Sequence, residues 1–442
     1  MGLIDDRVLD AMVGAAADAL DHTTATMFGE AMRRTLSDAV ERFDDGPAGT
    51  AFLLTGDIPA MWLRDSAAQM RPYLALLSLD PGLGDLIAAV VRQQSRQIVR
   101  DPYANAFNDG PTGAGHQADA TAMTPWTWER KYEVDSLAFP LQLAHQLWRA
   151  TGRTDHLDEA FVQAARLVMQ TIRVEQDHDA CSDYRFERTD CPDSDTLVGG
   201  HGTPVAVTGM TWSAFRPSDD ACRYHYNVPG NIFAAAALRD LAELAAAPLA
   251  DPDLGADAVT LATELEEAVE QHGVVEVPGF GPVWAYEVDG LGNHLLMDDA
   301  NMPSLMSLPL TGGVAPDDPR YLATRAFVLS EANPTFVRGR AAEGLGSPHT
   351  PAGYVWPIAA AVQGLTAREE QEKRAVLAML RDTHAARGRM TESFDADDPT
   401  RFTREWFSWA DAMFCELVLD VLGHRVPAGA REPQSHTSTN RT

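Results

Sequence analysis

Amphipathic helical patterns recur along this chain from its first residues to about residue 422, whereas strand-like runs are short and few. About twelve segments show the helical spacing of apolar residues. They cover roughly residues 6–22, 27–43, 65–79, 83–100, 133–150, 156–177, 230–246, 256–271, 318–330, 355–364, 367–386 and 405–422. The runs 51–54, 274–277 and 283–288 are typical of short strands. Because strands and helices do not alternate, the pattern argues against a parallel-sheet α/β fold and favours an all-α fold.

Long loops rich in Trp, Asp, Asn, Pro and Gly separate these helices. They cover residues 55–65, 101–132, 178–231, 289–303, 343–357 and 388–405. Loops of this length inside a compact domain are usually functional. Six such loops on about twelve helices predict six helical hairpins in a ring, an (α/α)6 barrel whose loops line a pocket on one face. We expect a single domain over residues 1–426 and a disordered polar tail at 427–442.

Two helix ends carry recognisable signals. Thr366 and Glu369 have the spacing of a capping box, which predicts that a helix opens there. Gly423 follows the apolar repeat of the last helix and is expected to end it.

The charge of the chain excludes some classes of partner. It has 35 basic and 64 acidic residues and a formal charge of -29. Such a field repels nucleic acids and anionic membrane surfaces, whereas neutral ligands are compatible with it. No apolar run is long enough to span a membrane. We therefore expect neither nucleic acid nor membrane as a partner. The expected oligomeric state is a monomer or weak homo-oligomer.

Cysteine usage and the N-terminal segment favour a cytoplasmic location. The chain has four cysteines, of which Cys181 and Cys191 are close enough in sequence to pair, a question that the sequence leaves open. The first residues predict an amphipathic helix and do not have the pattern of a signal peptide. Neither Cys-x-x-Cys nor His-Glu-x-x-His occurs, and we expect no cofactor.

The segment Gly209–Asn231 is too polar for a core and too rich in aromatic residues for an ordinary loop. Its acidic pair Asp219-Asp220 lies between Arg216 and Arg223. This mixture suits a loop that grips a polyhydroxylated ligand and supplies a proton. In this segment Arg216 and Asn227 are candidate ligand contacts.

A second cluster, Trp62, Arg64 and Asp65, is predicted to lie just before a helix. The face of a Trp ring stacks on the C–H groups of sugars, and a charged pair binds vicinal hydroxyls. The alternative is a buried Trp beside a structural ion pair.

Other loops hold further polar side chains at predicted helix starts. Glu133 and Asp135 are candidate sugar contacts, although acids at a helix N-terminus also simply complement the helix dipole. Asp298, Asp299 and Asn301 could bind hydroxyls or a hard cation such as calcium, but their spacing matches no EF-hand loop. Capping of the next helix is the structural alternative for this group.

A glycosidic bond is cleaved by two carboxyl groups, one that protonates the leaving oxygen and one that attacks or activates water. Glu392 lies between apolar Met390 and Phe394 and has no obvious local salt partner, so it is the best partner for the Asp219-Asp220 pair. The acid is expected to have a raised pKa. In another loop, His349 is a candidate for holding a sugar hydroxyl, and Trp356 is a candidate for lining the pocket.

At these residues the chain resembles glycoside hydrolase family 125, the exo-acting α-1,6-mannosidases. The matching segments span about residues 55–415 and read GDIPAMWLRDSAAQMRPYL, KYEVDSL, TGMTWSAFRPSDDACRYHYNVPGN, AYEVDGLGNHLLMDDANMPSL, GLGSPHTPAGYVWPI and MTESFDADDPTRFTREWFSWA. The resemblance implies an (α/α)6 barrel and metal-independent hydrolysis with inversion of the anomeric centre. It also implies an Asp general acid in the SDDA motif and a Glu general base, Glu392, in the MTESF motif.

Related (α/α)6 glycosidases resemble this chain in an Asp-x-x-x-Arg spacing whose first Asp is the acid. Asp219 and Arg223 match that spacing, which favours Asp219, with Asp220 binding sugar or tuning its neighbour. The expected substrate is a mannose-containing oligosaccharide or glycan. Three alternatives stay open: an (α/α)6 glycosidase for another sugar or linkage, a sugar-binding protein without catalysis, and a calcium-dependent mannosidase.

Overall fold

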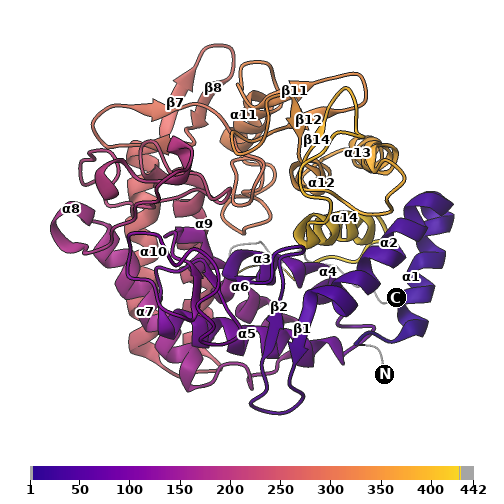
Figure 1. Ribbon diagram of the computed structural model, residues 1–442, viewed down its shortest axis with the longest axis horizontal. Coiled ribbons are helices and arrows are strands. Elements are labelled where there is room, and N and C mark those ends of the chain that lie inside the picture. Colours follow the sequence, from indigo (N-terminus) through magenta and orange to yellow (C-terminus); the bar gives the residue numbers. More distant parts are fainter. Residues whose placement is uncertain (1–2, 428, 430–442) are drawn as a thin grey trace, which may run out of the picture.

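The computed structural model describes residues 3–427 and 429 of the chain. This part contains fourteen α-helices and only short strands (Figure 1). The helices are α1 (Asp6–Ala19), α2 (His22–Arg34), α3 (Leu63–Gln69), α4 (Arg71–Ala75), α5 (Leu83–Arg100), α6 (Val134–Thr151), α7 (Glu159–Glu175), α8 (His178–Cys181), α9 (Val228–Ala246), α10 (Pro252–His272), α11 (Pro319–Val328), α12 (Pro357–Leu365), α13 (Glu370–Thr383) and α14 (Ser408–Val421).

The helices form a ring in which inner and outer members alternate along the chain (Figure 1). Among the inner helices, α3 packs on α6, α6 on α9 and α12 on α14, and α14 closes the ring by packing on α3, α4 and α2. Buried turns at residues 302–313 contact α6 and α9, through Gln142 and Ile232, where a sixth inner helix would lie. The protein is therefore an (α/α)6 barrel, as the sequence predicted.

Composition explains which helices are inside. Residues 134–147 of α6, 228–238 of α9 and 408–419 of α14 are buried on every side. A helix that is apolar all round must be covered on all faces. In contrast, α7 and α13 bury one stripe and expose the other, as outer helices do.

Short strands lead the chain into the inner helices. They are β1 (Val40–Phe43), β2 (Ala51–Leu53), β3 (Met61–Trp62), β4 (Ala106–Phe107), β5 (Thr127–Glu129), β6 (Tyr226–Asn227), β7 (Val274–Val277), β8 (Gly281–Trp284), β9 (Glu287–Val288), β10 (His294–Leu295), β11 (Phe336–Arg338), β12 (Glu343–Leu345), β13 (Tyr354–Val355) and β14 (Phe394–Asp395). They form small antiparallel sheets in the orders β1-β2, β3-β4-β5, β10-β9-β6, β7-β8, β11-β12 and β13-β14. Because β3, β6 and β13 run directly into α3, α9 and α12, these sheets gather the N-terminal ends of inner helices at one end of the barrel.

Most predicted elements are confirmed, and two local predictions are wrong. The predicted helix at 27–43 ends at Arg34, because a π-helical turn (Thr35–Ala39) leads into β1. Thr366 does not open a capping box: its hydroxyl donates to the Val362 carbonyl and caps the C-terminus of α12. Gly423 ends α14 with a φ of 86°, as expected.

Three further points bear on the sequence-based expectations. Cys181 and Cys191 are free thiols. Among the described residues, no helix has both the length and the apolar composition needed to cross a bilayer. The expectation of a tail at 427–442 falls almost wholly outside the described residues; Pro427 accepts a hydrogen bond from Gln146 Nε2 at 3.3 Å.

Candidate active site

A cavity of about 200 Å³ opens at the N-terminal ends of the inner helices. Fifteen residues line it: Thr55, Ile58, Trp62, Arg64, Asp65, Pro217, Ser218, Asp219, Asn301, His349, Trp356, Glu392, Arg404, Phe407 and Trp409. The sequence singled out eight of these as candidates, namely Trp62, Arg64, Asp65, Asp219, Asn301, His349, Trp356 and Glu392. The cavity is smaller than the roughly 300–1,000 Å³ typical of sites for drug-sized ligands, which suits one small polar group such as a single sugar unit.

Asp219 lies in a tight turn with a backbone conformation that non-glycine residues rarely adopt. Its φ is 68°, in the left-handed region. The turn is closed by the main-chain bonds from Arg216 to Asp220 (2.8 Å) and from Asp219 to Arg216 (2.9 Å). Lys131 Nζ donates to the Asp219 carbonyl oxygen at 2.7 Å. The side chain is one-quarter exposed (26%), and it reaches the cavity while Arg64 Nη2 binds its Oδ1 at 3.0 Å.

Arg64 is the centre of a buried cluster of carboxyl groups. Its Nη1 contacts Glu133 Oε2 at 2.6 Å and Asp135 Oδ2 at 3.1 Å, and its Nε lies 3.6 Å from Asp65 Oδ2. With Asp219, four acids therefore surround one guanidinium group. The carboxyl groups of Glu133 and Asp219 are also in hydrogen-bonding contact with each other. Four buried carboxylates cannot all be ionised around so few cations, so the cluster must hold at least one proton.

The electrostatics favour Glu133 as the group that carries this proton, although burial also raises the pKa of Asp65. Burial raises the pKa of Glu133 well above its usual range, and the neighbouring Asp219 and Asp135 add to the effect while Arg64 opposes it. Burial acts on Asp219 too, but Arg64 and Lys131 outweigh it and hold the pKa of Asp219 below its usual range. Burial raises the pKa of Asp135 to about 6 against the opposing effect of Arg64. The expectation of a raised pKa at the acid is therefore wrong for Asp219 in the unliganded protein: the raised group is its neighbour.

Glu392 lies in the loop just before β14, the strand that pairs with β13. Its side chain is mostly buried and lines the cavity, and its main-chain N–H donates to the Arg404 carbonyl at 3.2 Å. Arg404 Nη1 lies 3.5 Å from Glu392 Oε1, and the same guanidinium group binds Asp57. The expectation that Glu392 lacks a local salt partner is therefore wrong: Arg404, twelve residues on, is that partner.

Behind the cavity wall lies a second polar group. Asp220 Oδ1 is 3.0 Å from His349 Nδ1, and Asp220 Oδ2 is buried without a hydrogen-bond partner among the described residues. Burial opposes charge on His349, but Asp220 outweighs it and raises the pKa of His349 to about 9. Asp299 Oδ2 accepts hydrogen bonds from Ser218 and Ser347, each at 3.2 Å. This group holds the charged His349 at the cavity surface.

Seven predicted sugar contacts do not line the cavity, and each is engaged within the protein. They are Glu133, Asp135, Arg216, Asp220, Asn227, Asp298 and Asp299. Arg216 pairs with buried Glu287 at 2.5 Å, and the Asn227 side chain caps α9 through the Gly230 N–H. Asp298 accepts the main-chain N–H groups of Leu305 and Met306, at 2.8 and 3.0 Å. These residues lie outside the cavity lining and make contacts within the protein. Direct contact with sugar stays a prediction for them.

The described residues, 3–427 and 429, include no group of three or more His, Cys, Asp or Glu side chains that could hold a metal ion. At the loop considered for calcium, Asp298 directs both carboxyl oxygens to backbone N–H groups. Burial raises the pKa of Asp298 to about 8, which favours its neutral form. A neutral, backbone-bound carboxyl is a poor ligand for a hard cation.

Sequence reasoning missed several residues of the site. Phe407 and Trp409 line the cavity from the start of α14, and Arg404 and Lys131 position the two central carboxyl groups. Phe407, Trp409 and Arg404 fall within a segment noted for its motif, MTESFDADDPTRFTREWFSWA, but their periodicity reads equally well as helix core. Lys131 carried no signal, because its partner lies 88 residues further on.

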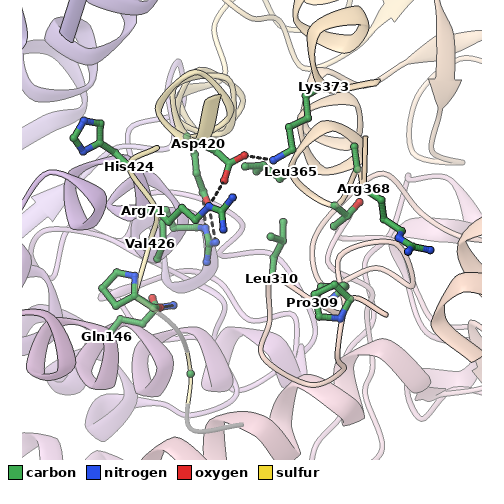
Figure 2. A pocket seen from close by; sticks show the side chains of 17 residues that line it. Arg71, Gln146, Pro309, Leu310, Leu365, Arg368, Lys373, Asp420, His424 and Val426 are labelled. Carbon is green, nitrogen blue, oxygen red and sulfur yellow. Dashed lines mark hydrogen bonds and ion pairs between the residues drawn. The ribbon is translucent and has the colours of Figure 1, made fainter. Parts of the chain in front are cut away.

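A larger cavity, of about 440 Å³, lies at the opposite ends of the inner helices (Figure 2). It is lined by the ends of α12 and α14, by α4 and by the segment 424–427. Five of its charged side chains pair with each other: Arg71 binds Glu416 at 2.7 Å, and Asp420 binds Lys373 and Arg425. This cavity shares no residue with the carboxyl-lined one, so its size does not make it the reaction site.

Two close relatives and a family model identify the group of proteins to which the chain is similar. The model of the family described as metal-independent α-mannosidase (GH125) matches residues 21–419. A curated protein of Schizosaccharomyces pombe, the meiotically up-regulated gene 157 protein, is 36% identical in an alignment of 423 residues that covers 91% of this chain and 83% of the relative.

Solved structures agree with the family model. A Streptococcus pneumoniae protein, from a family of metal-independent α-mannosidases and solved in a non-productive complex with α-1,6-mannobiose, is 46% identical, with a TM-score of 0.92 over 96% of this chain and 100% of that one. A bacterial glucoamylase with acarbose is 12% identical, with a TM-score of 0.51 over 83% of this chain and 49% of that one, and this likeness shows the fold alone. Because the family model covers nearly the whole chain and both close relatives match along most of their length, the chain belongs to the metal-independent α-mannosidases of glycoside hydrolase family 125.

Proposed function

We propose that the protein is an inverting exo-α-1,6-mannosidase that releases terminal mannose from mannose-containing glycans, with Asp219 as general acid and Glu392 as general base. The observation that carries this assignment is that both carboxyl groups line one small cavity, each beside an arginine. The linkage rests on the 46% identical Streptococcus pneumoniae protein, whose complex contains α-1,6-mannobiose. We propose cytoplasmic action as a monomer or weak homo-oligomer.

In this mechanism one mannose unit occupies the cavity among the aromatic side chains of Trp62, Trp356 and Trp409. Asp219 donates a proton to the oxygen that joins the mannose to the rest of the glycan. Glu392 takes a proton from a water molecule, and the oxygen of that water attacks the anomeric carbon from the opposite face of the ring. Inverting enzymes of this kind separate the two carboxyl groups by about 6.5–9.5 Å to leave room for the water.

Asp219 is the better candidate for the acid because of where each aspartate points. Asp219 lines the cavity, whereas Asp220 is 3% exposed and is bound to His349. Asp220 therefore acts through the histidine that it charges. His349, with Asn301 and Asp65, is placed to hold mannose hydroxyls.

Hydrolysis of a panel of disaccharides tests the substrate. We expect release of mannose from α-1,6-mannobiose, with much lower rates on the α-1,2 and α-1,3 mannobioses and on α-linked glucobioses. Addition of EDTA should leave the rate unchanged. A preference for a glucobiose would favour a different (α/α)6 glycosidase, and no turnover of any disaccharide would favour a sugar-binding protein.

Substitutions at the three candidate carboxyl groups test the roles. Glu392→Ala and Asp219→Asn should each lower kcat by about 10²–10⁴-fold, the usual contribution of a positioned acid or base. Azide should restore turnover to Glu392→Ala and yield β-mannosyl azide, because the small anion replaces the activated water. Asp220 would be the general acid if Asp220→Asn lowered kcat more than Asp219→Asn did, and only on substrates whose leaving group needs protonation.

A further inference from the structure

Glu133 is buried, and among the described residues only one of its two carboxyl oxygens has a hydrogen-bond donor. It precedes α6 and lies behind Arg64, outside the cavity lining. Its Oε2 accepts hydrogen bonds from Arg64 at 2.6 Å and from the Ser136 hydroxyl at 2.9 Å. Its Oε1 is buried and has no N–H or O–H donor among the described residues. A buried carboxyl oxygen without a donor is costly when it is charged and is stabilised when it carries a proton itself.

The partner that can receive such a proton is Asp219. Adjacent nitrogens of one guanidinium group hold the two carboxyl groups side by side, Nη1 at Glu133 and Nη2 at Asp219, and the electrostatics of both groups include a hydrogen bond between them. A hydrogen bond between two carboxyl groups requires one proton between them, because neither group can donate when both are ionised. The Glu133–Asp219 pair therefore holds a single proton across a preformed contact.

The charged groups around the pair favour one position of the proton in the empty site. Asp219 faces the cations Arg64, Lys131 and His349. Glu133 faces Arg64 together with the acids Asp135 and Asp219. The fields therefore lower the pKa of Asp219 and raise that of Glu133, so the proton rests on Glu133 when the cavity is empty.

We propose that Glu133 is a positioning residue that stores the proton of the general acid and passes it to Asp219 when a mannoside fills the cavity. This inference rests on the proposed role of Asp219 as the acid. A bound sugar removes water from the one-quarter exposed side chain of Asp219, which disfavours its ionised form and draws the proton across the contact.

The proton balance closes over one turnover. The O–H bond on Glu133 breaks and one forms on Asp219, leaving Glu133 as the carboxylate beside Arg64. Asp219 then gives this proton to the leaving oxygen, while Glu392 gains one from the attacking water. Glu392 releases its proton to solvent after the product leaves, and the Glu133–Asp219 pair takes one up through the open cavity.

The test compares a substrate that needs an acid with one that does not. Glu133→Gln keeps the shape and can still bind Arg64, but it has no acidic proton and its amide N–H would hold Asp219 ionised. On α-1,6-mannobiose we expect kcat/KM to fall by about 10²-fold, within the range for general acid catalysis. On 2,4-dinitrophenyl α-mannoside, whose leaving group needs no protonation, we expect a loss of less than about fivefold. The high-pH limb of the kcat profile on mannobiose should move to lower pH, because Asp219 alone binds its proton more weakly.

Asp135→Asn is the matched control. It removes another acid from the same guanidinium group but leaves the Glu133–Asp219 contact in place. We expect it to change both substrates by similar factors. If Glu133→Gln also slows both substrates equally and leaves the high-pH limb in place, Glu133 only supports Arg64 and the proposal is overturned.

Infrared spectroscopy tests the stored proton without relying on turnover or on a variant. The unliganded protein at neutral pH should show protonated-carboxyl absorption from both Asp298 and Glu133, and a thio-linked α-1,6-mannobiose should shift the Glu133 part of it as the proton moves to Asp219. Protonated-carboxyl absorption that stays unchanged when the analogue binds contradicts the proposal. Failure of the proposed function is separate, since it appears as absence of mannobiose hydrolysis by the unaltered protein.

Discussion

Lys131 donates a hydrogen bond of 2.7 Å to the main-chain carbonyl oxygen of Asp219, the residue whose φ of 68° places it in the left-handed region. The lysine is 2% exposed and also pairs with Asp195. This bond holds the main chain of the turn, while Arg64 holds the carboxyl group of Asp219. The candidate acid is thus oriented by two buried cations, Arg64 on α3 and Lys131 in the loop after β5.

This relationship makes Lys131→Met a test of how the turn is held. The change removes one of the two cations that pair with Asp195 and Glu129, the other being Arg188, and leaves the Asp219 carbonyl oxygen without this donor, which should cost about 1–3 kcal/mol of unfolding free energy. Misplacement of Asp219 should lower kcat by about 10²-fold. Urea unfolding and initial rates measure the two effects. Arg33→Met, which removes an exposed ion pair with Asp6 and Asp10, serves as the control and should cost no more than about 1 kcal/mol.

The pair of His349 and Asp220 predicts a pH dependence of stability. The folded pKa of His349 is raised to about 9 from the ordinary 6.5, so folding takes up a proton between these values. Its contribution is fully present below pH 6.5 and is lost as pH rises through 9. The Tm of the unaltered protein should therefore fall more than that of His349→Gln between pH 6.5 and 9. Parallel Tm curves for the two proteins over this window would contradict the assignment.

Gly56 lies against the loop that precedes α14. A Cβ at this position, where φ is 130°, would be 2.7 Å from the Trp406 carbonyl oxygen. Gly46 has a similar φ of 142° but nothing within 4 Å, so it isolates the backbone strain. Both Ala substitutions should cost about 1–3 kcal/mol through φ. Gly56→Ala should cost about 1–3 kcal/mol more through the clash and should raise KM, because it displaces Phe407. Equal Tm values for the two variants would contradict the predicted clash, because the loop before α14 would then move aside at no cost in stability.

The cavity at the opposite end of the barrel should serve stability and not turnover. Arg71 and Glu416 form a two-bonded ion pair there, with distances of 2.7 Å and both side chains 5% exposed. Arg71→Met leaves Glu416 unpaired and should cost about 3–5 kcal/mol in urea unfolding. At a temperature where the variant stays folded, its KM should match that of the unaltered protein. Arg425→Met, at an exposed ion pair, is the control and should change the stability by less than about 1 kcal/mol.

The sequence predicted the ring of helices because inner and outer helices differ in burial. This difference determines the spacing of apolar residues along each helix, which can be recognised in the sequence. The sequence also singled out Asp219 and Glu392, which line the same cavity, since carboxyl groups in apolar or aromatic loops stand out. It could not reveal that Glu133 touches Asp219 or that Lys131 bonds a carbonyl 88 residues away, because such contacts depend on how separate loops meet. The same limit led to the expectation of sugar contacts for Arg216, Asn227 and Asp298, whose buried partners lie on other segments or are main-chain groups.

Proton NMR of the first product formed from α-1,6-mannobiose tests the central claim most directly. Spectra recorded before mutarotation should show β-mannose as the initial product, because a water activated by Glu392 attacks the face opposite the leaving oxygen. Initial accumulation of α-mannose would contradict the account, since it would require retention through a covalent intermediate.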